Sequence, residues 1–109
     1  MLEIELAEEL VETIPSAEMV RYSKGGGDAC AVAVRIARTT TGRDKIIYSG
    51  YHGWHDWYQS AEHPAGVPKA LAGTALPFVE GDLDGLKRLL EDNRGEVAAI
   101  MMEPLRSTV

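Results

Sequence analysis

A run of three glycines is the part of this sequence with the clearest chemical meaning. Gly25, Gly26 and Gly27 lie between a strand-like stretch, residues 18–22, and a helix-like stretch, residues 29–41. Glycines at a strand-to-helix junction leave backbone N–H groups uncovered, and the N-terminus of a helix favours a negative charge. The run therefore predicts a site for a phosphorylated ligand. A flexible turn is the alternative, because the run matches neither of the common glycine-rich phosphate motifs.

An aromatic segment, residues 51–58, is the second group that could do chemistry. Aromatic rings at the end of a strand can stack on a planar ring of a ligand. The alternative is a loop pinned by burial of its tryptophans, and we expect Trp54 and Trp57 to be buried in either case. His52 and His55 beside Asp56 could suggest a metal site, but no other cluster supports one and no metal is predicted.

Two carboxylates complete the set of candidate residues. Glu103 directly follows the most apolar run of the chain, residues 97–102, and is either a site residue or a solvated strand end. Asp28 follows the glycines and is expected to cap the helix at 29–41. Because its charge opposes that of a phosphate, the backbone must do the binding.

The elements that position these residues alternate between helix and strand. Apolar spacing predicts helices at 6–14, 29–41 and 82–93, with Gly42 and Asp82 as caps, and strands at 18–22, 45–49, 75–79 and 97–102. Residues 50–74 form a long irregular loop. This order predicts an α/β fold with a mostly parallel sheet and flanking helices. Ligands of such sheets bind at the carboxyl ends of strands, where all three candidate groups fall.

Composition excludes several classes of protein. The chain has 109 residues and a net charge of -6, and its seven Arg and four Lys are scattered, so no nucleic-acid partner is expected. No apolar run approaches the roughly 18 residues of a membrane span. The acidic N-terminus is unlike a signal peptide, which favours the cytoplasm. Cys30 is expected to be a buried free thiol.

Several motifs together resemble one enzyme family. They are Ser23–Ala29, Arg35–Arg38, Thr41–Ile46, Tyr51–Gly53 and Met102–Pro104, in this order. The sequence resembles the class III pyridoxal-phosphate-dependent aminotransferases, nearest the glutamate-1-semialdehyde 2,1-aminomutase branch, over residues 6–104. The resemblance implies a fragment of a fold-type-I large domain, residues 1–109, with both ends of the family domain missing. It also implies a homodimeric parent enzyme acting on a small-molecule amino substrate.

The resemblance carries roles for six residues toward pyridoxal 5'-phosphate. Gly26, Gly27 and Asp28 match the phosphate-binding turn of the family. Tyr51 matches the aromatic residue that packs on the cofactor ring, and His52 shapes its turn. Glu103 matches an acidic residue at the end of a strand near the active site.

The sequence also departs from the family. Gly27 stands where a Ser or Thr is usual, which removes one possible phosphate contact. Thr108 stands where many members have a second acidic residue, which fits the aminomutase-like branch. None of the four lysines matches the Schiff-base lysine, so no catalytic residue is predicted and the isolated chain is expected to be inactive.

Two other functions stay open at this point. One is a non-catalytic α/β module that binds a phosphate or nucleotide through the glycines. The other is a structural fragment without a ligand, whose exposed sheet edges favour pairing with another chain. The sequence does not separate aminomutase from aminotransferase or name the amino donor.

Overall fold

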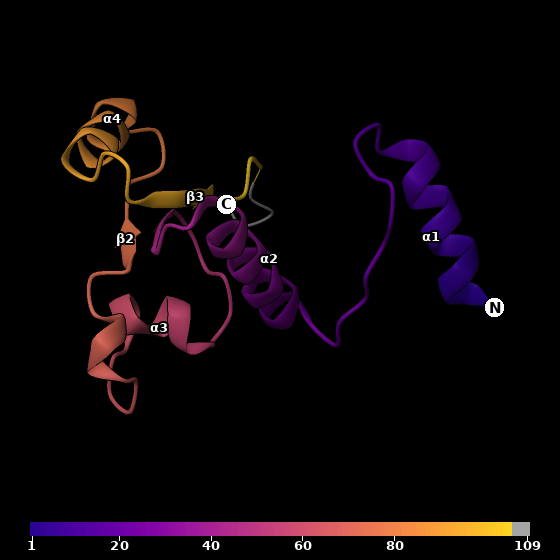
Figure 1. Cartoon of the computed structure of the whole chain (residues 1–109), viewed down its shortest axis with the longest axis horizontal. Helices are drawn as coiled ribbons and strands as arrows, with labels where there is room; N and C mark the ends of the chain where they lie inside the picture. Colours follow the sequence, from indigo (N-terminus) through magenta and orange to yellow (C-terminus); the bar gives the residue numbers. More distant parts are fainter. Residues whose placement is uncertain (106–109) are drawn as a thin grey trace.

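The computed structural model describes residues 1–105 of the chain (Figure 1). Its elements, in order, are α1 (Leu2–Thr13), α2 (Gly26–Thr41), β1 (Lys45–Tyr48), α3 (Asp56–Glu62), the 3-10 helix η1 (Lys69–Leu71), β2 (Ala75–Pro77), α4 (Leu83–Asp92) and β3 (Val97–Met101). None of the helices in this part of the chain is long and apolar enough to cross a membrane.

The three strands form one parallel sheet in the order β2-β1-β3. In the register of the sheet, Ile46 of β1 lies beside Ala75 of β2 and Ala99 of β3. This confirms the predicted α/β fold with a parallel sheet. Because the strands run the same way, the segments that follow them meet at one edge of the sheet, which is where the candidate residues were expected.

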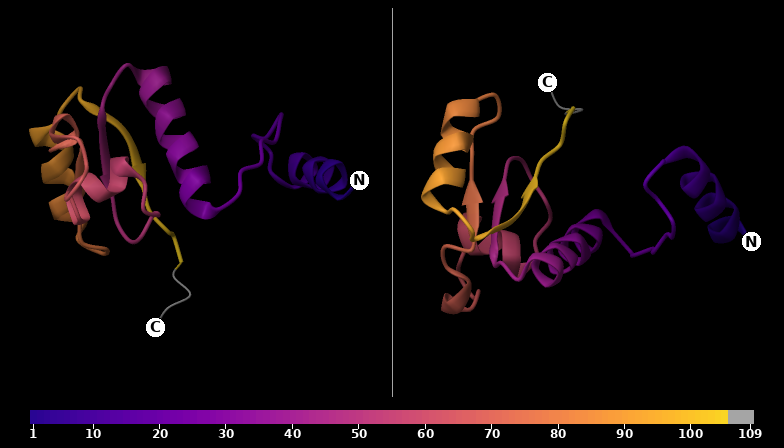
Figure 2. Two further views of the ribbon diagram at one scale, coloured as in Figure 1. Left: turned by 90° about the horizontal axis from the view of Figure 1, so that it is seen from below. Right: turned by 45° about the horizontal axis from the view of Figure 1, so that its top comes forward.

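The core lies between one face of the sheet and the helices α2 and α3, which pack against β3 and β2 (Figure 2). Its buried members come from β1, β2, α2 and α3 and are Val34, Ile46, Tyr48, Trp57, Tyr58 and Ala75. Side chains alternate along a strand, so Ile47 points to the opposite face, where it is also buried. β1 is thus the central and most buried element.

Local capping signals set the ends of two helices as predicted. Gly42 adopts the left-handed conformation, with φ 66°, and its N–H donates to the carbonyl of Arg38 at the end of α2. Asp82 caps α4, because its side chain accepts a hydrogen bond from the backbone N–H of Gly85 at 2.9 Å.

The predicted strand at 18–22 is wrong. These residues form no strand, and Met19 is 88% exposed. A strand needs a neighbour for its backbone hydrogen bonds, and the described sheet pairs only β1, β2 and β3. The segment instead joins α1 to the body, and the Tyr22 hydroxyl donates to the carbonyl of Glu3 at 2.7 Å.

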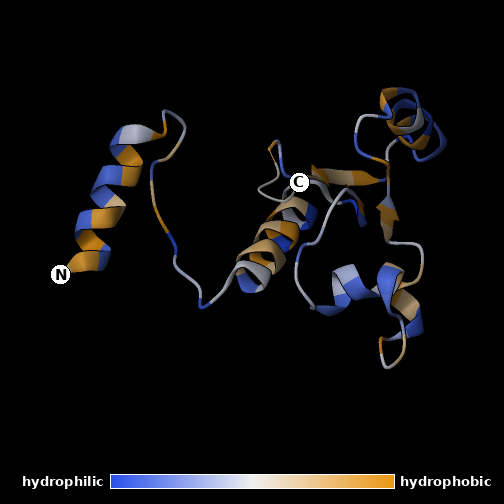
Figure 3. Ribbon diagram, turned by 180° about the vertical axis from the view of Figure 1, so that it is seen from behind, coloured by the Kyte–Doolittle hydropathy of each residue, from blue (hydrophilic) through white to orange (hydrophobic). Residues whose placement is uncertain are grey.

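Helix α1 confirms the amphipathic helix predicted near the N-terminus, but it has no buried residue. Figure 1 shows it apart from the other elements, and Figure 3 shows hydrophobic residues along it beside hydrophilic ones. The apolar spacing therefore predicted the helix without showing what it packs on.

Three further expectations are corrected by packing. The stretch 50–74 is not wholly irregular, because α3 and η1 form within it. The apolar run 97–102 predicts a strand buried on both faces, but β3 is an edge strand with Ile100 41% exposed. The leucine spacing in 82–93 predicts that Leu83, Leu86 and Leu90 point inward, but Leu83 and Leu90 of α4 are exposed.

Candidate functional site

A cleft of about 770 Å³ lies at the carboxyl edge of the sheet. Its walls are the first turn of α2, the segment after β1 and the end of β3. All six residues expected to contact a cofactor line it, although they come from three separate segments: Gly26, Gly27, Asp28, Tyr51, His52 and Glu103. The fold therefore brings the predicted set together, while their roles toward a ligand stay a prediction.

The α2 wall of the cleft presents backbone. The helix begins at Gly26, three residues earlier than predicted, and its N-cap residue Gly25 provides no side-chain hydrogen bond. The first N–H groups of a helix have no partner inside the helix. A Cβ atom placed on Gly25 or Gly26 would meet no other atom within 4 Å. The space beside Gly25 and Gly26 is therefore open, and both residues line the cleft.

Gly53 brings the segment after β1 against this turn. Its φ of 100° is a conformation that favours glycine, and a Cβ atom on it would lie 2.6 Å from the Cα of Gly27. The reverse contact is less tight, because a Cβ atom on Gly27 would lie 3.4 Å from the Cα of Gly53. The glycine at position 53 is thus required by the approach of two backbones.

Asp28 does not cap α2, which corrects the sequence prediction. It is the third residue of the helix, and its Oδ1 accepts a hydrogen bond from His55 Nε2 at 2.8 Å. His55 lies 27 residues further along the chain, and both side chains are about four-tenths exposed. Sequence reasoning did not pair these residues, since nothing in their spacing shows that the two segments meet.

The wall formed by the aromatic segment after β1, residues 51–58, has both exposed and buried side chains. Tyr51 is 67% exposed, and its ring contacts that of Tyr58 edge to face at 5.7 Å. Trp57 is buried as predicted, whereas Trp54 is 81% exposed and lines the cleft. The expectation that both tryptophans are buried is therefore wrong for Trp54. Trp57 lies within α3 and is buried, whereas Trp54 precedes the start of this helix at Asp56.

His52 supports this wall from behind. Its side chain is buried, and its Nε2–H donates to the carbonyl of Ser49 at 2.7 Å. Its ring also contacts Tyr48 and Tyr58. Because a carbonyl only accepts, Nε2 must carry the proton, so this histidine fixes the shape of the turn that precedes Gly53.

A tyrosine and a cysteine near the cleft have shifted acidities. Burial raises the pKa of Tyr48, and the hydrogen bond that its hydroxyl donates to Glu62 raises it further. Burial also raises the pKa of the Cys30 thiol, which lines the cleft. Cys30 is half-buried rather than buried as expected. Both groups are therefore kept neutral and suit packing rather than proton transfer.

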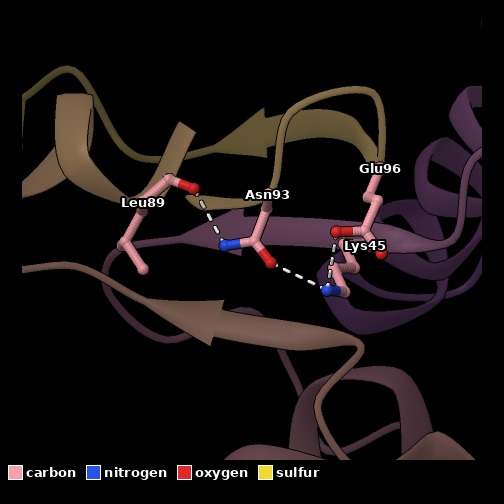
Figure 4. Close-up of polar contacts among 4 residues, drawn as sticks. All are labelled: Lys45, Leu89, Asn93 and Glu96. Carbon is pink, nitrogen blue, oxygen red and sulfur yellow. Dashed lines mark hydrogen bonds and ion pairs between the residues drawn. The ribbon is translucent and has the colours of Figure 1, made fainter. Parts of the chain in front are cut away.

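No lysine is among the residues that line the cleft within the described part of the chain. Lys45 opens β1, and its Nζ donates to Asn93 at 2.7 Å and pairs with Glu96 at 3.1 Å, as Figure 4 shows. Asn93 in turn donates to the carbonyl of Leu89 at 2.8 Å. Lys45 thus holds the turn after α4 to the start of β1. Thr108, the other position noted in the sequence, lies outside the described residues.

Comparison with known proteins finds aminotransferases and aminomutases that are similar to this chain. It is 43% identical over 100 residues to 3-aminobutyryl-CoA aminotransferase of Cloacimonas acidaminovorans, covering 92% of this chain and 24% of that protein. It is 41% identical over 116 residues to glutamate-1-semialdehyde 2,1-aminomutase of Pelodictyon phaeoclathratiforme, covering 95% and 27%. The solved structure of an omega-transaminase from Sphaerobacter thermophilus superposes with a TM-score of 0.82 at 32% identity, covering 94% and 27%.

The chain belongs to the class III pyridoxal-phosphate-dependent aminotransferase family. The resemblance read from the sequence is confirmed, and the aminomutase branch is among the relatives. Its fold is part of the fold-type-I architecture seen in a transaminase solved with pyridoxal phosphate bound. The chain spans about a quarter of the length of these curated relatives. No protein-family model matches it.

Proposed function

We propose that this chain supplies the phosphate-binding turn and part of the ring pocket of a pyridoxal-phosphate enzyme that transfers an amino group of a small-molecule substrate. The observation that carries the proposal is the uncapped N-terminus of α2 in the cleft. Residues 1–109 are then an internal part of a large domain, and the whole enzyme is a cytoplasmic homodimer.

The donor set of the cleft fits the phosphate group. The amides of Gly26, Gly27 and Asp28 stand at the positive end of the helix dipole and lack helical partners. The open space above Gly25 and Gly26 leaves room for phosphate oxygens to approach the backbone. Gly27 brings no hydroxyl, so the amides provide the binding from this chain.

The other two walls fit a planar ring. Tyr51 is exposed at the cleft and braced edge-on by Tyr58, so its face is available for stacking. Glu103 lies at the end of β3 on the remaining wall. In this proposal Tyr51 orients the ring, and the Glu103 carboxylate accepts a hydrogen bond from the bound ligand.

Pyridoxal phosphate, when bound, supplies the electron sink for amino-group chemistry. This chain's residues bind its phosphate and orient its ring. The described cleft offers no lysine amine, so the 109-residue chain is expected to bind the cofactor without turning substrate over.

The test places a side chain in the open space beside the proposed phosphate-binding turn. Gly26→Val should fold normally, because its Cβ meets no atom, but its methyl groups fill the space over the amides. We expect its affinity for pyridoxal 5'-phosphate to fall by about tenfold or more, since charge-assisted hydrogen bonds are lost. Thr40→Val, a β-branched change at an exposed position of the same helix, should bind as the unmodified chain does.

Calorimetric titration of both variants with pyridoxal 5'-phosphate measures this difference. Equal affinity of Gly26→Val and the unmodified chain would contradict the proposed phosphate turn. Titration with a nucleoside monophosphate separates the remaining function. Tighter binding of the nucleotide than of pyridoxal phosphate would favour the non-catalytic module.

A further inference from the structure

The carboxylate of Asp28 stands in the first turn of α2, where an anion would bind. A negative charge at this position is attracted to the same end of the helix dipole and repels a second anion. Acidic side chains in a first helical turn can also turn back to bond the free backbone amides. Asp28 is therefore placed to compete with a phosphate for the α2 N-terminus.

His55 holds this carboxylate in a different contact. Its Nε2–H donates to Asp28 Oδ1 at 2.8 Å, and Asp28 makes no capping bond to α2. The imidazole also lies beside the glycine turn, since a Cβ atom on Gly27 would be 3.4 Å from the Cδ2 of His55. The histidine thus draws the charge toward the 51–58 segment and away from the amides.

The backbone of His55 is fixed by the core. It is the N-cap residue of α3, and its carbonyl accepts hydrogen bonds from the N–H groups of Tyr58 and Gln59. The first turn of that helix carries the buried side chains of Trp57 and Tyr58. Because the backbone of His55 is held in place, its imidazole can hold the Asp28 carboxylate in one orientation instead of moving with it.

We propose that His55 is a positioning residue that restrains the Asp28 carboxylate and so keeps the N-terminal amides of α2 free for a phosphorylated ligand. The inference rests on the proposed function of the cleft. It differs from direct phosphate binding by His55, because its effect is exerted through Asp28 and disappears when Asp28 is removed.

Removing the histidine alone should release the carboxylate. His55→Ala is expected to weaken binding of pyridoxal 5'-phosphate by about fivefold, the scale of one side-chain hydrogen bond. Binding of pyridoxal, which has no phosphate, should change by less than about twofold. Asp28→Ala alone keeps the backbone amide assigned to the phosphate and removes only the competing carboxylate, so it should bind pyridoxal phosphate more tightly than the unmodified chain.

The double variant decides between a positioning role and a structural one. His55→Ala combined with Asp28→Ala should regain the affinity of the unmodified chain, because the competing charge is gone. A loss that came from damaged folding would persist in the double variant. His63→Ala is the matched control, since His63 is exposed at the other end of α3 and bonds only Gln59 in the described contacts.

The experiment measures the affinity of the 109-residue chain and these variants for pyridoxal phosphate and for pyridoxal by calorimetry. The expected result is a phosphate-specific loss in His55→Ala that Asp28→Ala reverses. Equal loss for both ligands, an unrecovered loss in the double variant, or a loss in Asp28→Ala overturns the role of His55. If the unmodified chain does not prefer pyridoxal phosphate over pyridoxal, the proposed function fails first and this inference fails with it.

Discussion

Helices α2 and α4 begin in opposite ways, although each has a glycine and an aspartate in or next to its first turn. At α4 the Asp82 side chain accepts from the N–H of Gly85, and a Cβ atom on Gly85 would collide with that carboxylate. At α2 the N-cap is Gly25, nothing occupies the space over Gly25 and Gly26, and the Asp28 carboxylate bonds His55 instead.

This difference separates a structural helix end from one available to a ligand. A helix closed by its own carboxylate has its exposed amide satisfied and its dipole partly neutralised. A helix whose N-terminus is uncapped at the carboxyl edge of a parallel sheet has free amides and an unneutralised dipole, and both attract an external anion. The same residue types therefore serve stability at α4 and binding at α2.

Transplanting the α4 cap onto α2 should have the largest effect. Gly25 has extended backbone angles that any residue adopts, and its Cβ position is free, so Gly25→Asp should fold. The new carboxylate would occupy the amides and repel a phosphate, which we expect to weaken pyridoxal phosphate binding by about a hundredfold. Titration calorimetry of the variant measures the loss.

Gly25→Asn is the matched control, because it caps the helix without a charge. It should fall between the unmodified chain and Gly25→Asp in affinity. If both variants bind as tightly as the unmodified chain, α2 is not the phosphate-binding end.

Disturbing the backbone contact between Gly53 and Gly27, at the uncapped N-terminus of α2, should have the next largest effect. Gly53→Ala places a methyl group 2.6 Å from the Cα of Gly27 and adds strain at φ 100°, so we expect a loss of about 2–3 kcal/mol in the free energy of unfolding. Gly66→Ala has a similar φ of 82° but no atom within 4 Å, and it should cost about 1 kcal/mol. Urea unfolding followed by circular dichroism compares them. Equal losses would show that the approach of the two backbones contributes nothing.

Removing the side-chain cap at the N-terminus of α4 should have the smallest effect. Asp82→Ala removes the α4 cap, and we expect the free energy of unfolding to fall by about 1 kcal/mol. Binding of pyridoxal phosphate should not change, because Asp82 lies outside the cleft. The same urea and calorimetric measurements test both statements. A change in affinity would mean that the two helix ends are not independent.

Features set by neighbouring residues could be predicted from the sequence. Gly42 and Asp82 were recognised as caps because their chemistry acts within one turn of the helix. The parallel sheet follows from the alternation of apolar runs, and the positions of the aromatic segment and Glu103 follow from the strands before them, whereas the strand predicted before the glycines does not form. All of these depend on short-range pattern and one general rule of α/β folds.

Features set by contacts between distant segments could not. Residues 18–22 have a strand-like pattern but no neighbour to pair with in the described sheet, and α3 forms in a stretch whose glycines and prolines suggested a loop. The Asp28–His55 pair and the exposure of Trp54 depend on how the segment after β1 folds back on α2. Spacing alone carries no information on such approaches.

The most direct test of the account is a phosphate titration of the ¹⁵N-labelled chain followed by amide NMR. We predict that the amide signals of Gly26, Gly27 and Asp28 move together and saturate with inorganic phosphate or pyridoxal phosphate. The amide of Gly85, already bonded by Asp82, should stay in place. Unmoved α2 amides, or equal movement at the two helix ends, would contradict the claim that the open N-terminus of α2 is the phosphate site.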